Sequence, residues 1–167
     1  MSMAAEKTGS IIDEAYDQYL TFSLAGEEYG VDILGVQEVK VWTRVTVLPN
    51  TPGYIKGVLD LRGSIVPIID LRARFGMESV DYDSTTVIIV LKLKIDLRDR
   101  IIGLVVDSVS DVLDIRHSEM RTTDQFDIRS RSEAITGVAT VNSKLVIMLN
   151  AAKLMDDSEM EMLESIG

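Results

Sequence analysis

The chain has 167 residues, no cysteine and one histidine, and it carries a formal net charge of −10. A chain of this length buries about 70% of the surface that it exposes when unfolded, so a hydrophobic core is possible. The lack of cysteine excludes disulfide frameworks, thiol nucleophiles and zinc clusters of the Cys/His kind. The negative charge opposes nucleic acids and anionic membranes, which bind basic surfaces. The composition therefore favours proteins or small molecules as partners.

The start of the chain and its hydropathy predict a soluble, cytoplasmic protein. Residues 1–15 are polar and acidic, lack the apolar stretch of a signal peptide, and are typical of a flexible tail. The longest aliphatic run, residues 87–91, is far shorter than the about 20 residues of a membrane-spanning helix.

Short strands and turns are predicted along the first half. Apolar and polar residues alternate over residues 19–24, as in a half-buried strand, and a turn follows at residues 25–28. If residues 34–40 are extended, one face carries Leu34, Val36, Glu38 and Lys40. An apolar strip flanked by both charges suits a protein interface, and an ordinary amphipathic strand explains it equally well.

A hairpin is predicted from Gly57 onward. Leu59 and Leu61 lie on one face of its first strand, the turn falls at residues 62–64, and residues 65–69 form an apolar return strand. Pro67 cannot donate a ladder hydrogen bond, so it indicates a sheet edge or a bulge. Asp70 then suits the N-cap of a short helix over residues 71–75.

The second half repeats this order. A strand is predicted at residues 85–93, a charged turn at 96–100, a strand at 101–106 and a second hairpin from Gly137. Asn150 takes the place of Asp70 and is expected to cap a closing helix over residues 151–165. Segment 30–39 also aligns with segment 103–112, which pairs Val36 with Val109, Glu38 with Asp111 and Val39 with Val112.

Duplication of short strands predicts a mainly β fold made of two small barrels. The first barrel is expected at about residues 16–82 and the second at about 83–150, with the option that the barrels exchange strands. No metal or cofactor site is expected.

Catalytic interpretations have little support. Asp60 and Asp70 could work as an acid and a base. Position 70 is Asn in the second copy, however, and Asn replaces Asp in a helix cap but not as a base. His117 has no second histidine or nucleophile near it in sequence and is predicted to be a loop residue. A small acidic β-barrel enzyme that uses these three residues is the alternative from another class, and a module for proline-rich peptides would need more aromatic residues than Trp42.

Arg62 is the residue that the repeat does not explain. The second hairpin has Asn142 at this position, so the turn is built without arginine. Arginine is enriched at interface hot spots, where its planar fork binds carboxylates. A local ion pair with Asp60 explains Arg62 equally well on these grounds.

Several motifs, in order, closely resemble the family of the bacterial chemotaxis coupling protein CheW. They extend over roughly residues 18–154 and comprise GEEYGVDIL (26–34), VQEV (36–39), TP (51–52), IKGV (55–58), LRG (61–63), IVPIIDLR (65–72) and VVDSVSDV (105–112).

The resemblance implies two intertwined five-stranded SH3-like barrels with short helices and a C-terminal helix. It implies an adaptor without catalysis, monomeric alone, that bridges the cytoplasmic tips of methyl-accepting chemotaxis receptors to the regulatory domain of the histidine kinase CheA in receptor arrays. A regulatory module of another two-component pathway is the nearest alternative.

Carried over by motif, the partner-binding residues are Arg62, Val36 and Glu38, with Gly57 and Gly63 shaping the hairpin. Val109 and Val112, in the matching segment of the second half, are candidates for the groove between the barrels or for a second contact with the kinase. Two departures stand out. The family commonly has Asn at position 60, and the turn over residues 94–100 is longer and more charged than usual. The double barrel takes up nearly all of the chain and leaves too few residues for a kinase or receiver module. We therefore expect a coupling protein that consists of this domain alone.

Overall fold

A computed structural model describes residues 15–122 and 133–164. Nearly all of the tail expected over residues 1–15, and the last residue of the expected closing helix, lie outside these ranges. Within them, no helix is long and apolar enough to cross a membrane.

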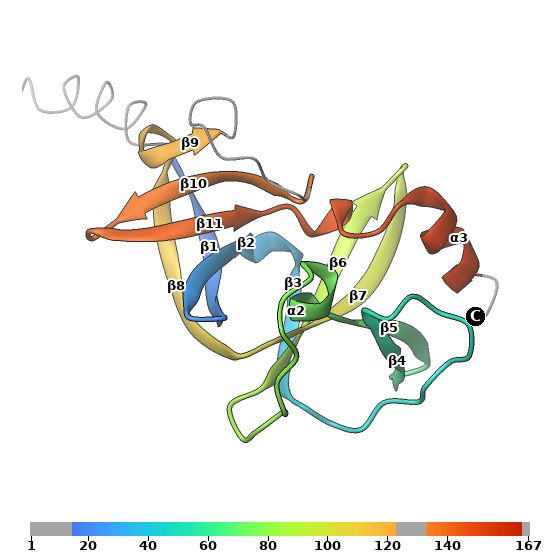
Figure 1. Cartoon of the computed structure of the whole chain (residues 1–167). Helices are drawn as coiled ribbons and strands as arrows, with labels where there is room; N and C mark the ends of the chain where they lie inside the picture. Colours follow the sequence, from blue (N-terminus) through green and yellow to red (C-terminus); the bar gives the residue numbers. More distant parts are fainter. Residues whose placement is uncertain (1–14, 123–132, 165–167) are drawn as a thin grey trace, which may run out of the picture.

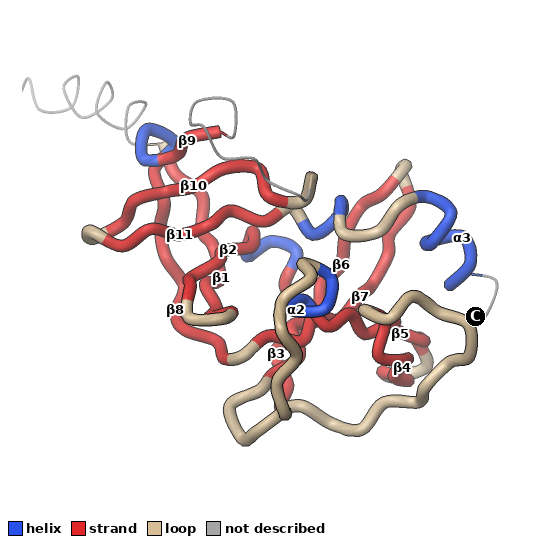
Figure 2. The backbone as a smooth tube through the Cα atoms, in the orientation of Figure 1, coloured by secondary structure: helices blue, strands red, loops and turns tan. Residues whose placement is uncertain are grey.

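Eleven strands of the described chain form two sheets, which Figures 1 and 2 show side by side. The six-stranded sheet has the order β8-β1-β2-β11-β10-β9. Its strands are β1 (Tyr16–Leu24), β2 (Glu27–Asp32), β8 (Ser108–Arg116), β9 (Met120–Thr122), β10 (Ile135–Val141) and β11 (Lys144–Leu149). The sheet therefore combines strands from both ends of the chain.

The five-stranded sheet has the order β3-β6-β7-β5-β4. Its strands are β3 (Val36–Val41), β4 (Ile55–Leu61), β5 (Ser64–Asp70), β6 (Val87–Ile95) and β7 (Arg98–Val106). Thr46, in the chain that follows β3, bridges to Val58 of β4, so the first and last strands of this sheet meet and the barrel closes. The mainly β fold of two small barrels is confirmed, and the short β9 adds a sixth strand to one of them.

Each sheet contains one parallel pair among antiparallel ones. In the five-stranded sheet β5 runs parallel to β7, with Ile68 beside Gly103. In the six-stranded sheet β11 runs parallel to β2, with Ile147 beside Tyr29. The hairpin predicted twice in the sequence thus occupies equivalent places in the two sheets.

Apolar side chains of residues 15–122 and 133–164 form three cores. Val66, Ile88 and Val105 belong to the core inside the five-stranded barrel, and Ile115 and Val146 belong to the corresponding core of the six-stranded one. The largest cluster lies between the sheets and draws on both; its fully buried members include Phe22, Leu24, Ile69, Leu71, Ile89 and Leu104. Burial of this inter-sheet face joins the two barrels into one unit.

Two-residue turns with positive φ at both positions close four hairpins in the part of the chain that the structure describes. They are Ala25-Gly26, Arg62-Gly63, Asp96-Leu97 and Asn142-Ser143. Such turns match the right-handed twist of the strands they join. The charged turn predicted over residues 96–100 is therefore too long, because Arg98, Asp99 and Arg100 pair with Ile95, Lys94 and Leu93 of β6 and belong to β7.

The helices are short. Asp70 caps α2 (Leu71–Arg74) by accepting a hydrogen bond from the Ala73 amide at 3.2 Å, as predicted. The prediction that Asn150 caps a helix is confirmed. The prediction of a single closing helix is wrong, because a 3-10 turn, η4 (Ala151–Lys153), is followed by a separate helix, α3 (Asp157–Glu164). Asp156 separates the two, because its carboxylate accepts the Glu159 amide at 2.8 Å and begins a new helix.

Candidate partner-binding surface

Arg62 lies at the tip of the β4–β5 hairpin. Its backbone has a positive φ, which Asn, Asp and Gly adopt more readily than arginine. Its φ is 52°, and that of Gly63 is 88°. Asn, Asp and Gly are the residues that favour this turn, because an ordinary side chain is crowded at positive φ. Asp60 holds the turn by accepting the Gly63 amide at 2.9 Å. The fold thus explains Asp60 and Gly63 but not Arg62.

The guanidinium of Arg62 pairs with Glu38 of β3. Arg62 Nη2 lies 3.1 Å from Glu38 Oε1, and the two side chains are 77% and 29% exposed. The ion pair with Asp60 considered from the sequence is not formed. Since β3 and β4 are the two ends of the sheet order, this pair spans the seam where the barrel closes. An exposed pair of this kind adds only about 0–1 kcal/mol to stability, so most of the arginine's fork remains open to a partner.

The face predicted for residues 34–40 is only partly formed. Leu34 lies in a 3-10 turn, η1 (Ile33–Gly35), and is 90% exposed, so it does not share the strand face. Val36 is half-buried against the inter-sheet core, and the register shifts between Val36 and Glu38. Glu38 therefore supplies a charged group to the exposed face of β3. Val36 holds β3 in place by packing against the inter-sheet core.

Gly57 permits the close approach that completes the seam. Its φ is 149°, and a Cβ atom there would lie 2.1 Å from the carbonyl oxygen of Thr46. That oxygen accepts the Val58 amide at 2.8 Å. Gly137 plays the same part in the other sheet, where a Cβ atom would lie 2.2 Å from the carbonyl oxygen of Arg121 in β9.

Val109 and Val112 lie on the other sheet. Both belong to β8, where Val109 is half-buried against the inter-sheet core and Val112 is 47% exposed. They pair with Phe22 and Leu20 of β1. The structure therefore brings Arg62, Glu38, Val36, Gly57 and Gly63 to one sheet and places these two valines on the second.

The three residues of the enzymatic alternative do not form a site. Asp60 stands opposite Ile65 in the hairpin, so about 17 Å of strand separates it from Asp70. Asp70 accepts hydrogen bonds from the Ala73 amide and from the hydroxyl of Tyr82, whose pKa is raised by burial and by this contact. His117 pairs with Asp17 on the other sheet. No cluster of three or more His, Asp or Glu side chains that could hold a metal occurs in the described ranges.

A second ion pair, which the sequence did not single out, joins the halves of the molecule. Arg72 of α2 binds Asp107 through two hydrogen bonds, of 2.9 and 2.7 Å. Asp107 also accepts the amide of Ala25, in the β1–β2 turn, at 2.9 Å. The hydrogen bonds from Arg72 hold the pKa of Asp107 below its usual range, against a smaller opposing effect of burial. This carboxylate thus links α2, the end of β7 and the six-stranded sheet.

Asp107→Asn is expected to lower the free energy of unfolding by about 1.5–3 kcal/mol at neutral pH, because it removes a charge-assisted pair. The pKa of Asp107 is lower in the folded chain than the value of about 3.9 expected when unfolded. The stabilisation is therefore complete above about pH 4 and is lost as the pH falls through the lowered folded value. Urea unfolding at neutral pH and at pH values below about 4 measures both effects.

The control for this prediction is Asp81→Asn, which changes an exposed loop carboxylate. We expect it to change stability by less than about 0.5 kcal/mol at either pH. A deficit of Asp107→Asn that stays constant through the acid range would contradict the assignment.

Comparison with known proteins agrees with the resemblance seen in the sequence. The family described as CheW-like domain matches residues 18–159. "Chemotaxis protein CheW" of Klebsiella aerogenes is 42% identical over 150 residues, covering 90% of this chain and 88% of its own. "Probable chemotaxis protein CheW" of Rhizobium etli is 31% identical over 144 residues, covering 86% and 90%.

A solved structure is similar as well. The crystal structure of the scaffolding protein TtCheW from Thermoanaerobacter tengcongensis superposes with a TM-score of 0.77 at 32% identity. The match covers 89% of this chain and 99% of that one.

Proposed function

The chain belongs to the family of CheW-like domains, and from that membership we propose that it is a chemotaxis adaptor, which couples methyl-accepting receptors to the histidine kinase CheA. It works without catalysis, at the cytoplasmic tips of the receptors, and is held there by protein contacts. The observation that carries this proposal is the exposed Arg62–Glu38 pair. Its arginine occupies a turn position that the fold would fill better with Asn or Gly.

An adaptor needs at least two separate surfaces, and in this proposal each sheet carries one of them. In this proposal Arg62 and Glu38 form one surface, supported by Val36 and shaped by Gly57 and Gly63. Val109 and Val112 form the other surface, on β8. Binding at one surface then changes the affinity at the other through a coupling free energy, which the shared inter-sheet core transmits.

The test is reconstitution from purified components. We expect the chain to bind the receptor signalling domain and the CheA regulatory domain separately. We also expect the three components together to give a kinase activity that depends on receptor only when this chain is present. Co-sedimentation and phosphate release measure binding and activity. Failure of the chain to bind either component would overturn the adaptor role.

A further inference from the structure

The outer half of the β4–β5 hairpin has no strand beside it on the β7 side within the described chain. β5 pairs with β7 only where residues 68–70 lie beside residues 103–105. Nearer the turn that carries Arg62, the two strands diverge around a cavity of about 310 Å³. Leu59 and Leu61 pack the inner face of this half against the barrel core. Its other side, toward the cavity, has no such support from β7.

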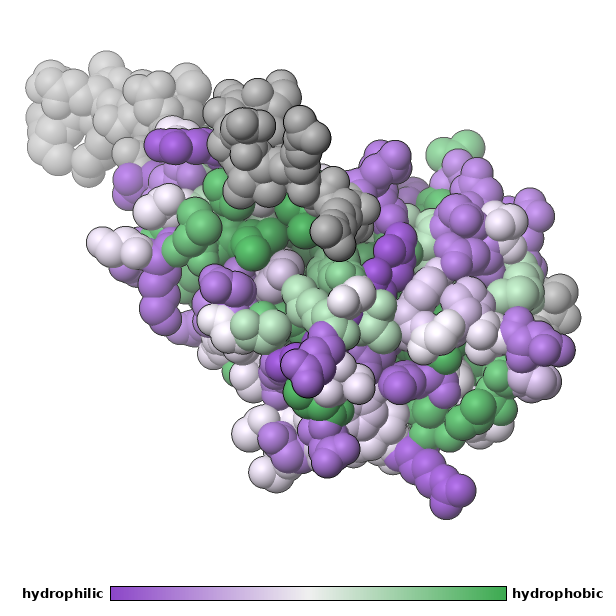
Figure 3. Space-filling model, viewed as in Figure 1, coloured by the Kyte–Doolittle hydropathy of each residue, from purple (hydrophilic) through white to green (hydrophobic). Residues whose placement is uncertain are grey.

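α3 is too short to be a stable helix apart from the barrel. It has eight residues, and isolated helices shorter than about 12–15 residues are marginal in water. The Asp156 amide donates to the Glu159 carboxylate at 3.0 Å, and the Glu159 amide donates back at 2.8 Å. Asp157, Ser158 and Glu161 are exposed, and Figure 3 shows mostly hydrophilic surface over α3. The helix therefore depends on docking for its structure, and docked and released α3 are two states of one segment.

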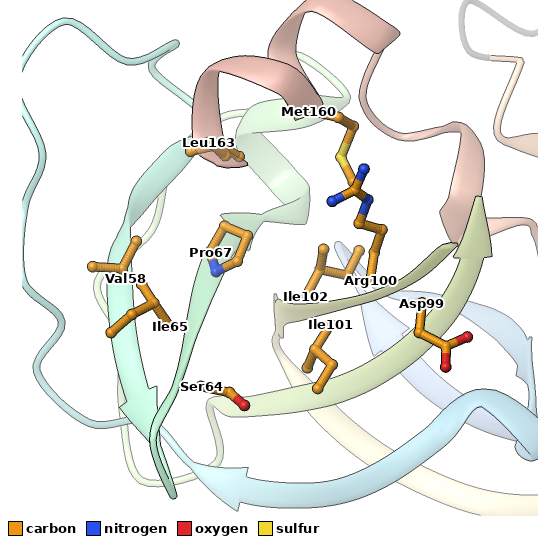
Figure 4. A pocket seen from close by; sticks show the side chains of 10 residues that line it. All are labelled: Val58, Ser64, Ile65, Pro67, Asp99, Arg100, Ile101, Ile102, Met160 and Leu163. Carbon is orange, nitrogen blue, oxygen red and sulfur yellow. The ribbon is translucent and has the colours of Figure 1, made fainter. Parts of the chain in front are cut away.

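The apolar side of α3 lies over the opening between the diverging strands. Met160 and Leu163 line the cavity together with residues of β4, β5 and β7. Figure 4 shows Leu163 toward the β4–β5 side and Met160 toward the β7 side. Met160 is buried in the inter-sheet cluster, which also contains Ile55 of β4 and Ile102 of β7. The helix thus connects two walls of the barrel that do not pair with each other at this point.

Tyr54, directly before β4, ties α3 to the hairpin. Its hydroxyl donates a hydrogen bond to the Glu159 carboxylate, and burial together with this contact raises the pKa of Tyr54. Its carbonyl accepts the amide of Asp70, at the end of β5, at 2.8 Å. The guanidinium of Arg74 lies over the Tyr54 ring, 5.3 Å from its centroid. Tyr54 therefore links α3 to both strands of the hairpin.

We propose that docked α3 positions the β4–β5 hairpin for the partner that binds Arg62, and that release of α3 lowers the affinity for this partner. Tyr54, Met160 and Leu163 are the positioning residues, and they act through the hairpin without touching the partner. Once α3 is released, the outer half of the hairpin loses its support across the cavity, and binding must order it again at a cost in conformational entropy. The inference rests on the proposed adaptor function and adds a conformational control to it.

The coupling between α3 and the partner is reciprocal. If docking of α3 strengthens binding by some factor, binding of the partner strengthens docking of α3 by the same factor. Amide hydrogen exchange of residues 157–164 measures docking, because released α3 is not a stable helix. We expect saturation with the Arg62-dependent partner to slow this exchange in wild type by at least about fivefold. A helix that only stabilises the barrel would not respond to the partner.

The main variant is Met160→Asp, measured on the full chain against the receptor signalling domain and the CheA regulatory domain in separate titrations. A carboxylate is costly in the apolar cluster but is solvated when α3 is released, so this variant keeps α3 undocked. We expect the affinity for the partner that depends on Arg62 to fall by at least about fivefold and the other affinity to stay unchanged. Continued protection of the barrel strands from exchange shows that the variant is folded.

Two conservative variants separate docking from other effects. Tyr54→Phe removes only the hydrogen bond to Glu159, and we expect it to speed the exchange of α3 by roughly tenfold, the effect of losing a hydrogen bond to a charged group. Tyr19→Phe is the matched control, because its hydroxyl contacts Met120 in the other sheet, and it should leave the exchange of α3 unchanged.

Glu161→Lys tests whether α3 itself touches the partner. Glu161 is exposed on the docked helix, so reversal of its charge should leave docking and both affinities unchanged. A loss of affinity as large as that of Met160→Asp would make α3 a direct contact and overturn the proposal.

The remaining outcomes are equally decisive. Unchanged affinity in Met160→Asp overturns the proposal, as does an equal loss for both partners. If Met160→Asp does not fold, the wild-type measurement decides, because exchange of α3 that the partner does not slow also overturns it. Failure of wild type to bind either protein overturns the adaptor function itself, which the wild-type titrations reveal before any variant is compared.

Discussion

Replacement of Gly57 by alanine is expected to lower the free energy of unfolding by about 2–5 kcal/mol. The backbone has a φ of 149°, which side chains rarely adopt, and the new Cβ would lie 2.1 Å from the Thr46 carbonyl oxygen. That oxygen cannot move away freely, because it accepts a hydrogen bond from the Val58 amide. The Thr46 amide in turn donates a hydrogen bond to the Val58 carbonyl. The substitution therefore opens the seam where β4 meets the chain after β3.

Gly53→Ala is the matched control for this prediction. A Cβ atom at Gly53 would have no neighbouring atom within 4 Å, and the backbone there has no positive φ, so alanine should change stability by less than about 1 kcal/mol. Urea unfolding followed by circular dichroism compares the two. Equal stability of the two variants would show that the seam does not depend on a glycine. Gly137→Ala meets the Arg121 carbonyl in the other sheet but has no positive φ, so it should destabilise the chain less than Gly57→Ala does.

The sequence locates these glycines but not the reason for them. Comparison of the two hairpins places Gly57 and Gly137 at the same point of a repeat, and repetition alone indicates a role in the fold. The contacts that require glycine come from Thr46 and Arg121. Both residues lie in segments whose sequence pattern is too weak to predict a strand. A close approach between chain segments depends on how the sheet closes, which local patterns do not encode.

Errors in the predicted elements have local causes. The charges predict a turn at residues 96–100, yet Lys92 and Lys94 lie on the exposed face of a strand whose other face carries Leu93 and Ile95. The predicted closing helix runs through Asp156, although aspartate favours a helix start over a helix interior. Residues 98–100 carry no alternation of their own and are strand only because they pair with β6, whereas the capping preference of Asp156 is visible in the sequence.

The residues of the candidate surface are predictable one by one, and their assembly is not. The sequence singles out Glu38 and Arg62 separately, but they lie on opposite ends of the sheet order and meet only because the barrel closes. The Arg72–Asp107 pair escapes prediction for the same reason, since 35 residues separate its members and neither stands out locally. Residue type indicates what a side chain can bind, and topology decides what it meets.

Arg62→Asn should separate binding from folding. Asparagine tolerates positive φ, and the second hairpin already uses it at Asn142, where φ is 51°. The lost ion pair with Glu38 is exposed, so the melting temperature should stay within a few degrees of wild type. If Arg62 is an interface hot spot, its truncation costs about 2 kcal/mol or more, or roughly 30-fold in affinity for its partner. Titration calorimetry and thermal unfolding of the same samples measure the two quantities.

Two companion variants test whether the loss of binding is caused by the arginine itself and by its position. Arg62→Glu places a second carboxylate beside Glu38 and should weaken binding further than Arg62→Asn, because repulsion is added to the lost contact. Asn142→Arg puts the same side chain on the hairpin tip of the other sheet and should leave binding at the Arg62 surface unchanged. Retained affinity in Arg62→Asn would mean that the arginine serves only Glu38. A selective loss would mean that a turn position unfavourable for folding holds an arginine because a partner binds it.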